Sequence, residues 1–533
     1  MALGELTADR RWAVECKLGD ALADAGRAAE AAAVYLAVAE ASERAQVAPG
    51  AIVAMSGAAR TPLALRQLAA EGLLCSGHIE RGMAVFRSVL ATRGLSFPGG
   101  PVRAVLLLLW RRLRLRLRGL RFTARPAEDI APAVLERIDG CWSAATALIG
   151  WDSIRAGGFH SLNMLLSLRA GEPRRLQIAV GMERILLAML GAGPDDHRLR
   201  TLEDLSDTLL AEYGSIRDGR GELPFDGLNA IVRAASAFYQ GRWQACCDEA
   251  DTAMDSLGER GEGVAWHLAT ARTLALAARG FIGDMRGVVR VLPAVLDDIR
   301  AKGDLYSEIL LYNTVGYRLA LMADQPDRAM AELEDCNRRW PEREAGAPYM
   351  ARLHAELSIA LYQGQSWRAY QLIRGHWPRV AGSFMLRVHI HRISVRSVRG
   401  RAALAAIRER PEQRLALLRV AARDARNLER LDIPWSRPWA AVVRAGVARA
   451  RGDDDGALRD LRAAERDFEQ CDMFLSRAGV LRRIGELLGG DEGQALIAEA
   501  DALYLAQGVV CPERYASMLV PPLPEPLNTK KPP

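Results

Sequence analysis

Lysine is almost absent from this chain of 533 residues, which contains only Lys17, Lys302, Lys530 and Lys531. Reactions that need a lysine nucleophile or a lysine Schiff base therefore have few candidate residues. Aromatic residues make up 6% of the chain, and runs of β-branched residues are scarce. Because those two kinds of residue favour strands, the composition favours helices over sheets.

Motifs for metal binding, redox chemistry and catalysis are missing. The eight cysteines include no C-x-x-C pair, so we expect buried thiols in a reducing compartment. His389 and His391 are two residues apart and do not share a helix face, which argues against a metal site. The sequence has no G-x-x-x-x-G-K-[ST] loop, G-x-G-x-x-G loop or G-x-S-x-G elbow. We therefore expect no enzyme activity, no cofactor and no metal.

Long apolar runs are missing as well. The uncharged run at Ala104–Trp110 is far shorter than the ~20 residues that span a bilayer. The first residues, MALGELTADRR, contain no apolar segment of the kind found in signal peptides. We expect a cytoplasmic protein without a transmembrane segment.

Alanine, leucine and arginine are abundant, and they are spaced as in helix hairpins. Residues 16–40 place Leu18 and Gly19 before a turn, and Ala31 four residues before Tyr35, which partly matches the tetratricopeptide pattern. Residues 69–90 repeat this pattern with Gly82 and Phe86. Further along, small residues that mark a period near 40 residues are Ala329, Ala369, Ala416, Ala457 and Ala495.

These patterns predict an all-α fold, a tetratricopeptide-like α-solenoid of stacked helix hairpins. Such a right-handed superhelix has a concave groove, which is the default site for a protein partner. We predict N-terminal hairpins over 1–95, a basic helix with its connection over 96–130 and a middle helical region over 131–220. A C-terminal array follows over 221–510, and a proline-rich disordered tail over 511–533.

The most unusual stretch is LLLLWRRLRLRLRGLRF, residues 106–122. Between Pro101 and Arg125 there are eight arginines and no acid, so the rest of the chain, with a total charge of +6, sums to −2. A strand is discounted because no partner strand is evident. As a helix, the stretch places Leu106, Leu109, Leu113, Leu117 and Leu120 on one face. The candidate interaction residues are Arg111, Arg114, Arg118 and Arg121 on another face, with Arg112 and Arg116 beside these leucines.

Two interpretations of this helix stay open. It is an ordinary solenoid helix whose arginines extend into solvent or pair with acids on neighbouring hairpins. Alternatively, it contacts phosphates, anionic lipid or an acidic partner surface. Among these we favour a protein, since nucleic-acid readers usually interleave aromatics or add a second basic element. Here only Trp110 and Phe122 flank the run.

Residues 17–40, 106–122 and 138–175 together resemble the C-terminal helical-repeat region of very large bacterial serine/threonine kinases. In those proteins a kinase domain and an AAA-type ATPase domain precede the repeats. The kinase and ATPase parts are absent here, so no residue inherits a catalytic role.

The resemblance implies a tetratricopeptide-like scaffold, or a sensory or regulatory arm, in bacterial kinase or NTPase signalling. Its expected partner is a kinase, an NTPase or another signalling protein. One alternative is a remnant of a kinase–ATPase polypeptide. Another is anionic-surface or nucleic-acid binding through the arginine-rich helix.

Overall fold

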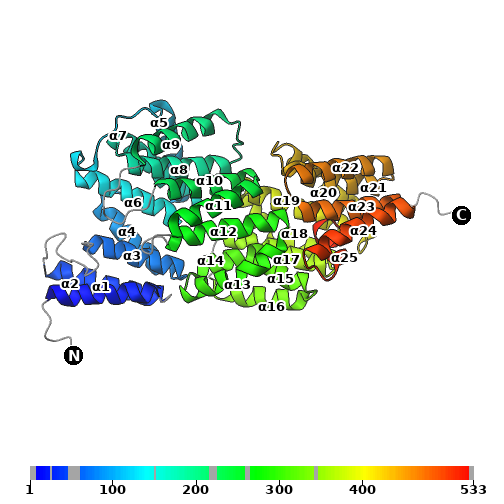
Figure 1. The fold of residues 1–533 in the computed structure, drawn as a ribbon, viewed down its shortest axis with the longest axis horizontal. Coiled ribbons are helices and arrows are strands. Elements are labelled where there is room, and N and C mark those ends of the chain that lie inside the picture. The colour runs from blue at the N-terminus through cyan, green and yellow to red at the C-terminus, as the bar shows by residue number, and fades with distance from the viewer. Residues whose placement is uncertain are drawn as a thin grey trace. The chain divides into compact units, whose positions relative to one another are not determined.

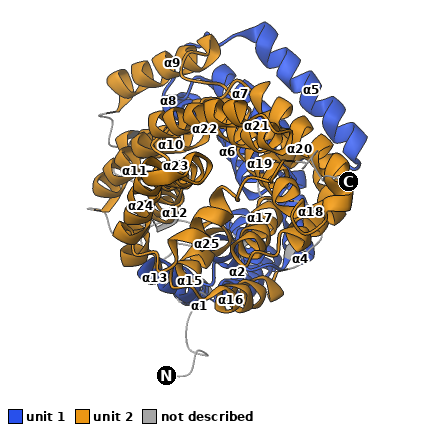
Figure 2. Ribbon diagram, turned by 90° about the vertical axis from the view of Figure 1, so that its right-hand side faces the viewer, with its two compact units in different colours: residues 1–179, 293–309 blue, residues 180–292, 310–533 orange. Residues whose placement is uncertain are grey.

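The computed structural model describes residues 8–24, 27–45, 61–148, 152–214, 225–258, 265–340 and 346–526. Within these ranges every regular element is a helix, and many pairs of consecutive helices pack side by side as hairpins (Figure 1). The predicted all-α fold of stacked helix hairpins is therefore confirmed. The chain divides into two compact units (Figure 2).

Unit 1 comprises residues 1–179 and 293–309. Its helices are α1 (Ala8–Asp24), α2 (Ala28–Arg44), α3 (Pro62–Cys75), α4 (Ile79–Thr92), α5 (Pro101–Arg118), α6 (Pro132–Leu148) and α7 (Ser153–Ala170). The boundaries between the units fall within α8 (Pro173–Met189) and close to the middle of α13 (Met285–Ala301). They do not coincide with the boundaries between the predicted segments.

Unit 2 comprises residues 180–292 and 310–533. Its helices up to residue 340 are α9 (His197–Tyr213), α10 (Phe225–Gln240), α11 (Trp243–Gly258), α12 (Ala265–Ile282), α15 (Tyr317–Met322) and α16 (Pro326–Arg338). They continue with α17 (Ala347–Tyr362), α18 (Ser366–Gly382), α19 (His389–Ala406), α20 (Arg414–Glu429) and α21 (Ser436–Ala450). The last are α22 (Asp454–Gln470), α23 (Phe474–Leu488), α24 (Gly490–Ala506) and α25 (Pro512–Leu519). The short α14 (Leu305–Leu311) crosses the boundary at residue 309.

The first hairpin shows why small residues recur in the sequence. A Cβ atom on Gly19 of α1 would lie 2.5 Å from Cε1 of Tyr35 on α2, so only glycine permits this approach. Tyr35 is 5% exposed, and its hydroxyl donates a hydrogen bond to Asp20 Oδ1 at 2.7 Å. The residue pattern at 16–40 therefore describes a real helix–helix contact.

The later small residues are only partly where the period near 40 residues places them. Ala329, Ala369 and Ala457 are fully buried, whereas Ala416 and Ala495 are exposed. The buried alanines of α20 are Ala421 and Ala425. The period near 40 residues matches the spacing of the hairpins. On α20 and α24, however, the alanines that it picks out lie on the exposed side and not on the buried side.

Aromatic rings join the beginning of unit 2 to its later hairpins. The rings of Trp243 on α11 and Phe281 on α12 stack with centroids 4.1 Å apart. Trp435, just before α21, meets Trp243 edge-on at 5.5 Å. Trp243 and Trp435 are fully buried and therefore serve as packing residues. The first hairpins of this unit therefore share one hydrophobic core with α19 to α23.

The C-terminal segment is ordered through residue 526, so the prediction of a disordered tail over 511–533 is wrong for most of its length. Residues 512–519 form α25, which contacts α17, α23 and α24, and the other helices of unit 2 surround it in Figure 2. Tyr515 and Met518 are buried. The extended residues that follow are held by hydrogen bonds to their carbonyl oxygens. For example, Arg483 Nε donates to the carbonyl oxygen of Val520 at 2.8 Å. Residues 527–533 lie outside the described part of the chain.

Candidate interaction surface on helix α5

Helix α5 has clear start and stop residues. Gly100 is its N-cap, and Pro101 occupies the first turn, where its missing N–H leaves no hydrogen bond unmade. Gly119 ends the helix with φ +71, a conformation that side chains disfavour. The eighteen residues between them confirm the predicted helix and exclude the strand.

One side of α5 packs on α7. Ala104 is 3% exposed and Leu115 is 8% exposed. Arg111 Nη1 donates to the carbonyl oxygen of Gly158 at 2.8 Å, and Arg118 Nη2 donates to that of Leu168 at 2.8 Å. Leu168 lies in the last turn of α7, where carbonyl groups lack helical partners and favour a positive charge. Burial lowers the pKa of both guanidinium groups.

The opposite side of α5 carries an apolar stripe that faces away from the unit. Among the described residues, this helix holds seven of the eighteen exposed large apolar side chains. They are Val102, Val105, Leu106, Leu109, Trp110, Leu113 and Leu117. We call all of them except Val105, which lies at the edge, the leucine stripe. In Figure 2, α5 lies at the edge of unit 1 beside α7.

The structure separates the six predicted interaction residues. Arg111 and Arg118 hold α5 on α7, and Arg112 is half-buried. Arg114, Arg116 and Arg121 are exposed, and Arg121 lies beyond the helix end, where its carbonyl accepts a hydrogen bond from Arg118.

One of the two open interpretations allowed the arginines to pair with acids on neighbouring hairpins, and three exposed arginines of α5 do not form such pairs. Arg103, Arg114 and Arg116 are exposed and pair with no carboxylate in the described ranges. On a helix of roughly 100° per residue, Arg103 and Arg114 border one side of the leucine stripe, and Arg112 and Arg116 border the other. The surface is therefore an apolar band between two rows of positive charge.

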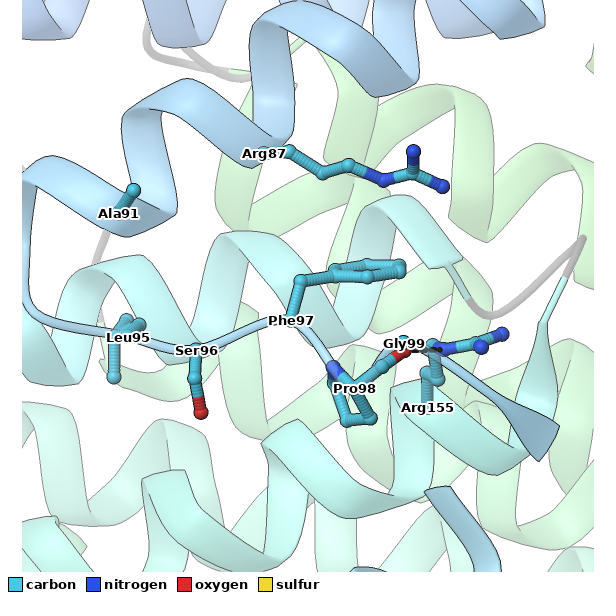
Figure 3. A pocket seen from close by; sticks show the side chains of 8 residues that line it. All are labelled: Arg87, Ala91, Leu95, Ser96, Phe97, Pro98, Gly99 and Arg155. Carbon is cyan, nitrogen blue, oxygen red and sulfur yellow. Dashed lines mark hydrogen bonds between the residues drawn. The ribbon is translucent and has the colours of Figure 1, made fainter. Parts of the chain in front are cut away.

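The loop before α5 was not anticipated from the sequence. Phe97 lies between the side chains of Arg87 and Arg155 (Figure 3), whose Cζ atoms are 4.9 and 5.1 Å from the ring centroid. Arg155 on α7 also donates from Nε to the carbonyl of Pro98 at 2.9 Å and pairs with Asp152. Arg87, Phe97 and Arg155 border a cavity of about 360 Å³. Their contacts position the start of α5, and no sequence motif indicates them.

No protein-family model and no curated protein matches the chain. None of the described helices combines the length and the apolar character that a membrane span requires.

Other reactive side chains are sequestered. No cluster of three or more His, Cys, Asp or Glu side chains in the described part of the chain is placed to hold a metal. Burial lowers the pKa of His389 and of His391 to about 4. Burial likewise raises the pKa of the Cys141 thiol to about 12, which keeps it protonated.

The prediction of buried thiols is confirmed for most of the cysteines described. Cys16, Cys141, Cys246, Cys247, Cys336 and Cys471 are buried, and Cys511 is half-buried. The side chain of Cys75 lies outside the described part. The surface of α5 remains the strongest candidate for function.

Proposed function

We propose that this chain is a non-catalytic interaction scaffold or regulatory arm that joins a larger assembly through helix α5. The observation that carries the proposal is the leucine stripe. Contiguous apolar surface is seldom left in water on a soluble domain unless something binds to it. The hydrogen bonds of Arg111 and Arg118 to α7 support the proposal, because they hold the leucine stripe in one outward orientation.

The resemblance to kinase–ATPase repeat regions suggests which assembly this is. We propose bacterial serine/threonine kinase or NTPase signalling in the cytoplasm, with a kinase, an NTPase or another signalling protein as partner. The tetratricopeptide-like pattern at residues 16–40 supports this choice. Its contact between Gly19 and Tyr35 is of the kind that such hairpins use.

The test is affinity capture of the tagged chain from its host lysate, with and without nuclease. We expect a nuclease-resistant kinase or NTPase. The matched variants are Leu109→Gln with Leu113→Gln on α5, and Leu415→Gln with Leu505→Gln elsewhere, all at exposed leucines. If the partner assembles at the α5 surface, the first pair reduces its recovery and the second does not.

Two results contradict the proposal. The scaffold role fails if the wild-type chain retains no protein above background. The non-catalytic role fails if the purified chain binds ATP or phosphorylates itself, which is the result expected of a kinase–ATPase remnant.

A further inference from the structure

We infer that the leucine stripe of α5 lies on the surface of an anionic lipid bilayer, parallel to the membrane plane. This inference rests on the proposed function, in which α5 is the contact surface, and it names the chemistry of what α5 contacts. The signalling partner then meets the chain at the membrane that α5 contacts, so loss of that contact also lowers recovery of the partner.

The first argument is the order of side chains around the helix. Leu106, Leu109, Leu113 and Leu117 are 48–78% exposed and form the middle of the stripe. Arginines lie on both of its borders. A helix at a bilayer surface inserts its apolar face between the acyl chains, while long basic side chains at the borders reach back to the headgroup phosphates. The surface of α5 has this arrangement.

The second argument is charge. Eight arginines and no acid lie between Pro101 and Arg125. Arg103, Arg114 and Arg116 are exposed beside the leucine stripe and have no carboxylate partner in the described ranges. An anionic leaflet attracts such a segment, and each nearby arginine strengthens binding by about fivefold. Electroneutral lipid lacks this attraction.

The third argument is shape, and it separates lipid from the other anionic partners. The stripe runs along a convex helix of eighteen residues, about 27 Å long. A protein would need an apolar groove of that length between two acidic rows, whereas lipid rearranges around any convex face. Nucleic acid would engage the arginines and leave the leucines in water. Trp110, 56% exposed at the border of the stripe, is the residue type that favours the bilayer interface.

The packing of α5 on α7 leaves the leucine stripe exposed without any rearrangement of the helix. Arg111 and Arg118 donate hydrogen bonds to carbonyl oxygens of α7 on the side opposite the stripe. The helix therefore does not have to turn or detach before its leucines meet a membrane.

The experiment is co-sedimentation of the full chain with vesicles. One vesicle type contains equal amounts of phosphatidylglycerol and phosphatidylcholine, and the other contains phosphatidylcholine alone. We expect binding to the first and little to the second. Arg103→Gln with Arg114→Gln and Arg116→Gln should weaken binding by about 100-fold, at about fivefold for each arginine. Leu109→Gln with Leu113→Gln should weaken it by at least as much.

Matched controls lie on α20 and α24. Arg419→Gln with Arg423→Gln and Arg426→Gln removes three exposed arginines of α20. Leu415→Gln with Leu505→Gln removes two leucines that are 67% and 56% exposed. Neither control should change vesicle binding.

A second measurement reports depth of insertion. Brominated acyl chains should quench part of the fluorescence of the eleven tryptophans, and Trp110→Phe should abolish that quenching. Quenching that survives in Trp110→Phe would place another part of the chain in the bilayer and overturn the assignment to α5.

The remaining outcomes are distinct. Equal binding to both vesicle types, or no binding to either, overturns the inference. Binding that depends on the arginines but not on the leucines overturns it in favour of a general polyanion contact. If a protein partner is lost with the α5 variant while vesicles do not bind, the proposed function stands and this inference fails. If vesicles bind and no protein partner is captured, this inference stands and the scaffold role fails.

Discussion

The stability of unit 2 should depend on the protonation of His389, the first residue of α19. The side chain is 1% exposed, and its ring lies 6.1 Å from that of Trp435. Burial lowers its pKa from 6.5 to about 4, and the nearby charge of Arg392 adds to this effect. The nearby carbonyls of Ala188 and Tyr239 oppose the shift without cancelling it, although neither ring nitrogen forms a hydrogen bond. The folded state therefore holds this imidazole neutral.

The direction of the pH dependence follows from the two pKa values. As the pH falls below about 6.5, the unfolded chain binds a proton at this residue and the folded chain does not. Stability is therefore lost as the pH falls from about 6.5 to about 4, and the loss is complete below about 4. The fall of the pKa from 6.5 to about 4 corresponds to about 3 kcal/mol of stability, of which about 2 kcal/mol is lost by pH 5.

The perturbation is His389→Phe, which replaces the imidazole with a ring that cannot bind a proton. We would measure the free energy of unfolding in urea by circular dichroism at pH 7 and pH 5. The difference between the two pH values should shrink by about 2 kcal/mol in the variant. The control is His197→Phe, at the exposed start of α9. An unchanged difference in His389→Phe would refute the argument that burial keeps this residue neutral.

Three further predictions concern packing. Trp243→Ala should destabilise unit 2 by about 3–5 kcal/mol in urea unfolding, because the indole is fully buried. Trp110→Ala, on the exposed face of α5, should change the free energy of unfolding little. Equal losses in the two variants would contradict the burial of Trp243. Tyr515→Ala should release α25, seen as faster proteolysis of the C-terminal segment, while Tyr515→Phe should not; unchanged proteolysis would mean that α25 is not docked. Gly171→Ala should lower the melting temperature more than Gly94→Ala, because both have positive φ but only the first would place its Cβ 1.9 Å from a backbone oxygen; equal losses would reject the close approach.

Local chemistry was enough to predict the helices and their hairpins. A period of 3.6 residues, a glycine or proline at a helix end and a small residue facing an aromatic ring act within one or two turns. The contact of Gly19 with Tyr35 was therefore predictable from residues sixteen apart. The start and end of α5 at Pro101 and Gly119 follow from the same short-range rules.

Short-range rules could not predict that the C-terminal segment is ordered. Its prolines cannot form a regular hydrogen-bonded structure by themselves, so composition alone indicates an extended tail. The segment is held by carbonyl acceptors that meet arginines from distant helices. Arg401 Nη1 donates to Met518 at 3.0 Å, and Arg414 Nη2 donates to Glu525 at 2.6 Å. Burial lowers the pKa of Arg401 to about 9.

For helix α5, the sequence determined the helix, and the tertiary structure determined its orientation. Its sequence determined an amphipathic helix with leucines on one face and arginines beside them. Leucine occurs on both sides of the helix, however, so periodicity could not say which side faces the protein. The side that faces the protein is set by the carbonyl oxygens of Gly158 and Leu168. They accept hydrogen bonds from Arg111 and Arg118, which lie about 50 residues away along the chain. Hydrogen bonds to buried carbonyls stabilise that side against α7, and the leucine stripe is left on the surface.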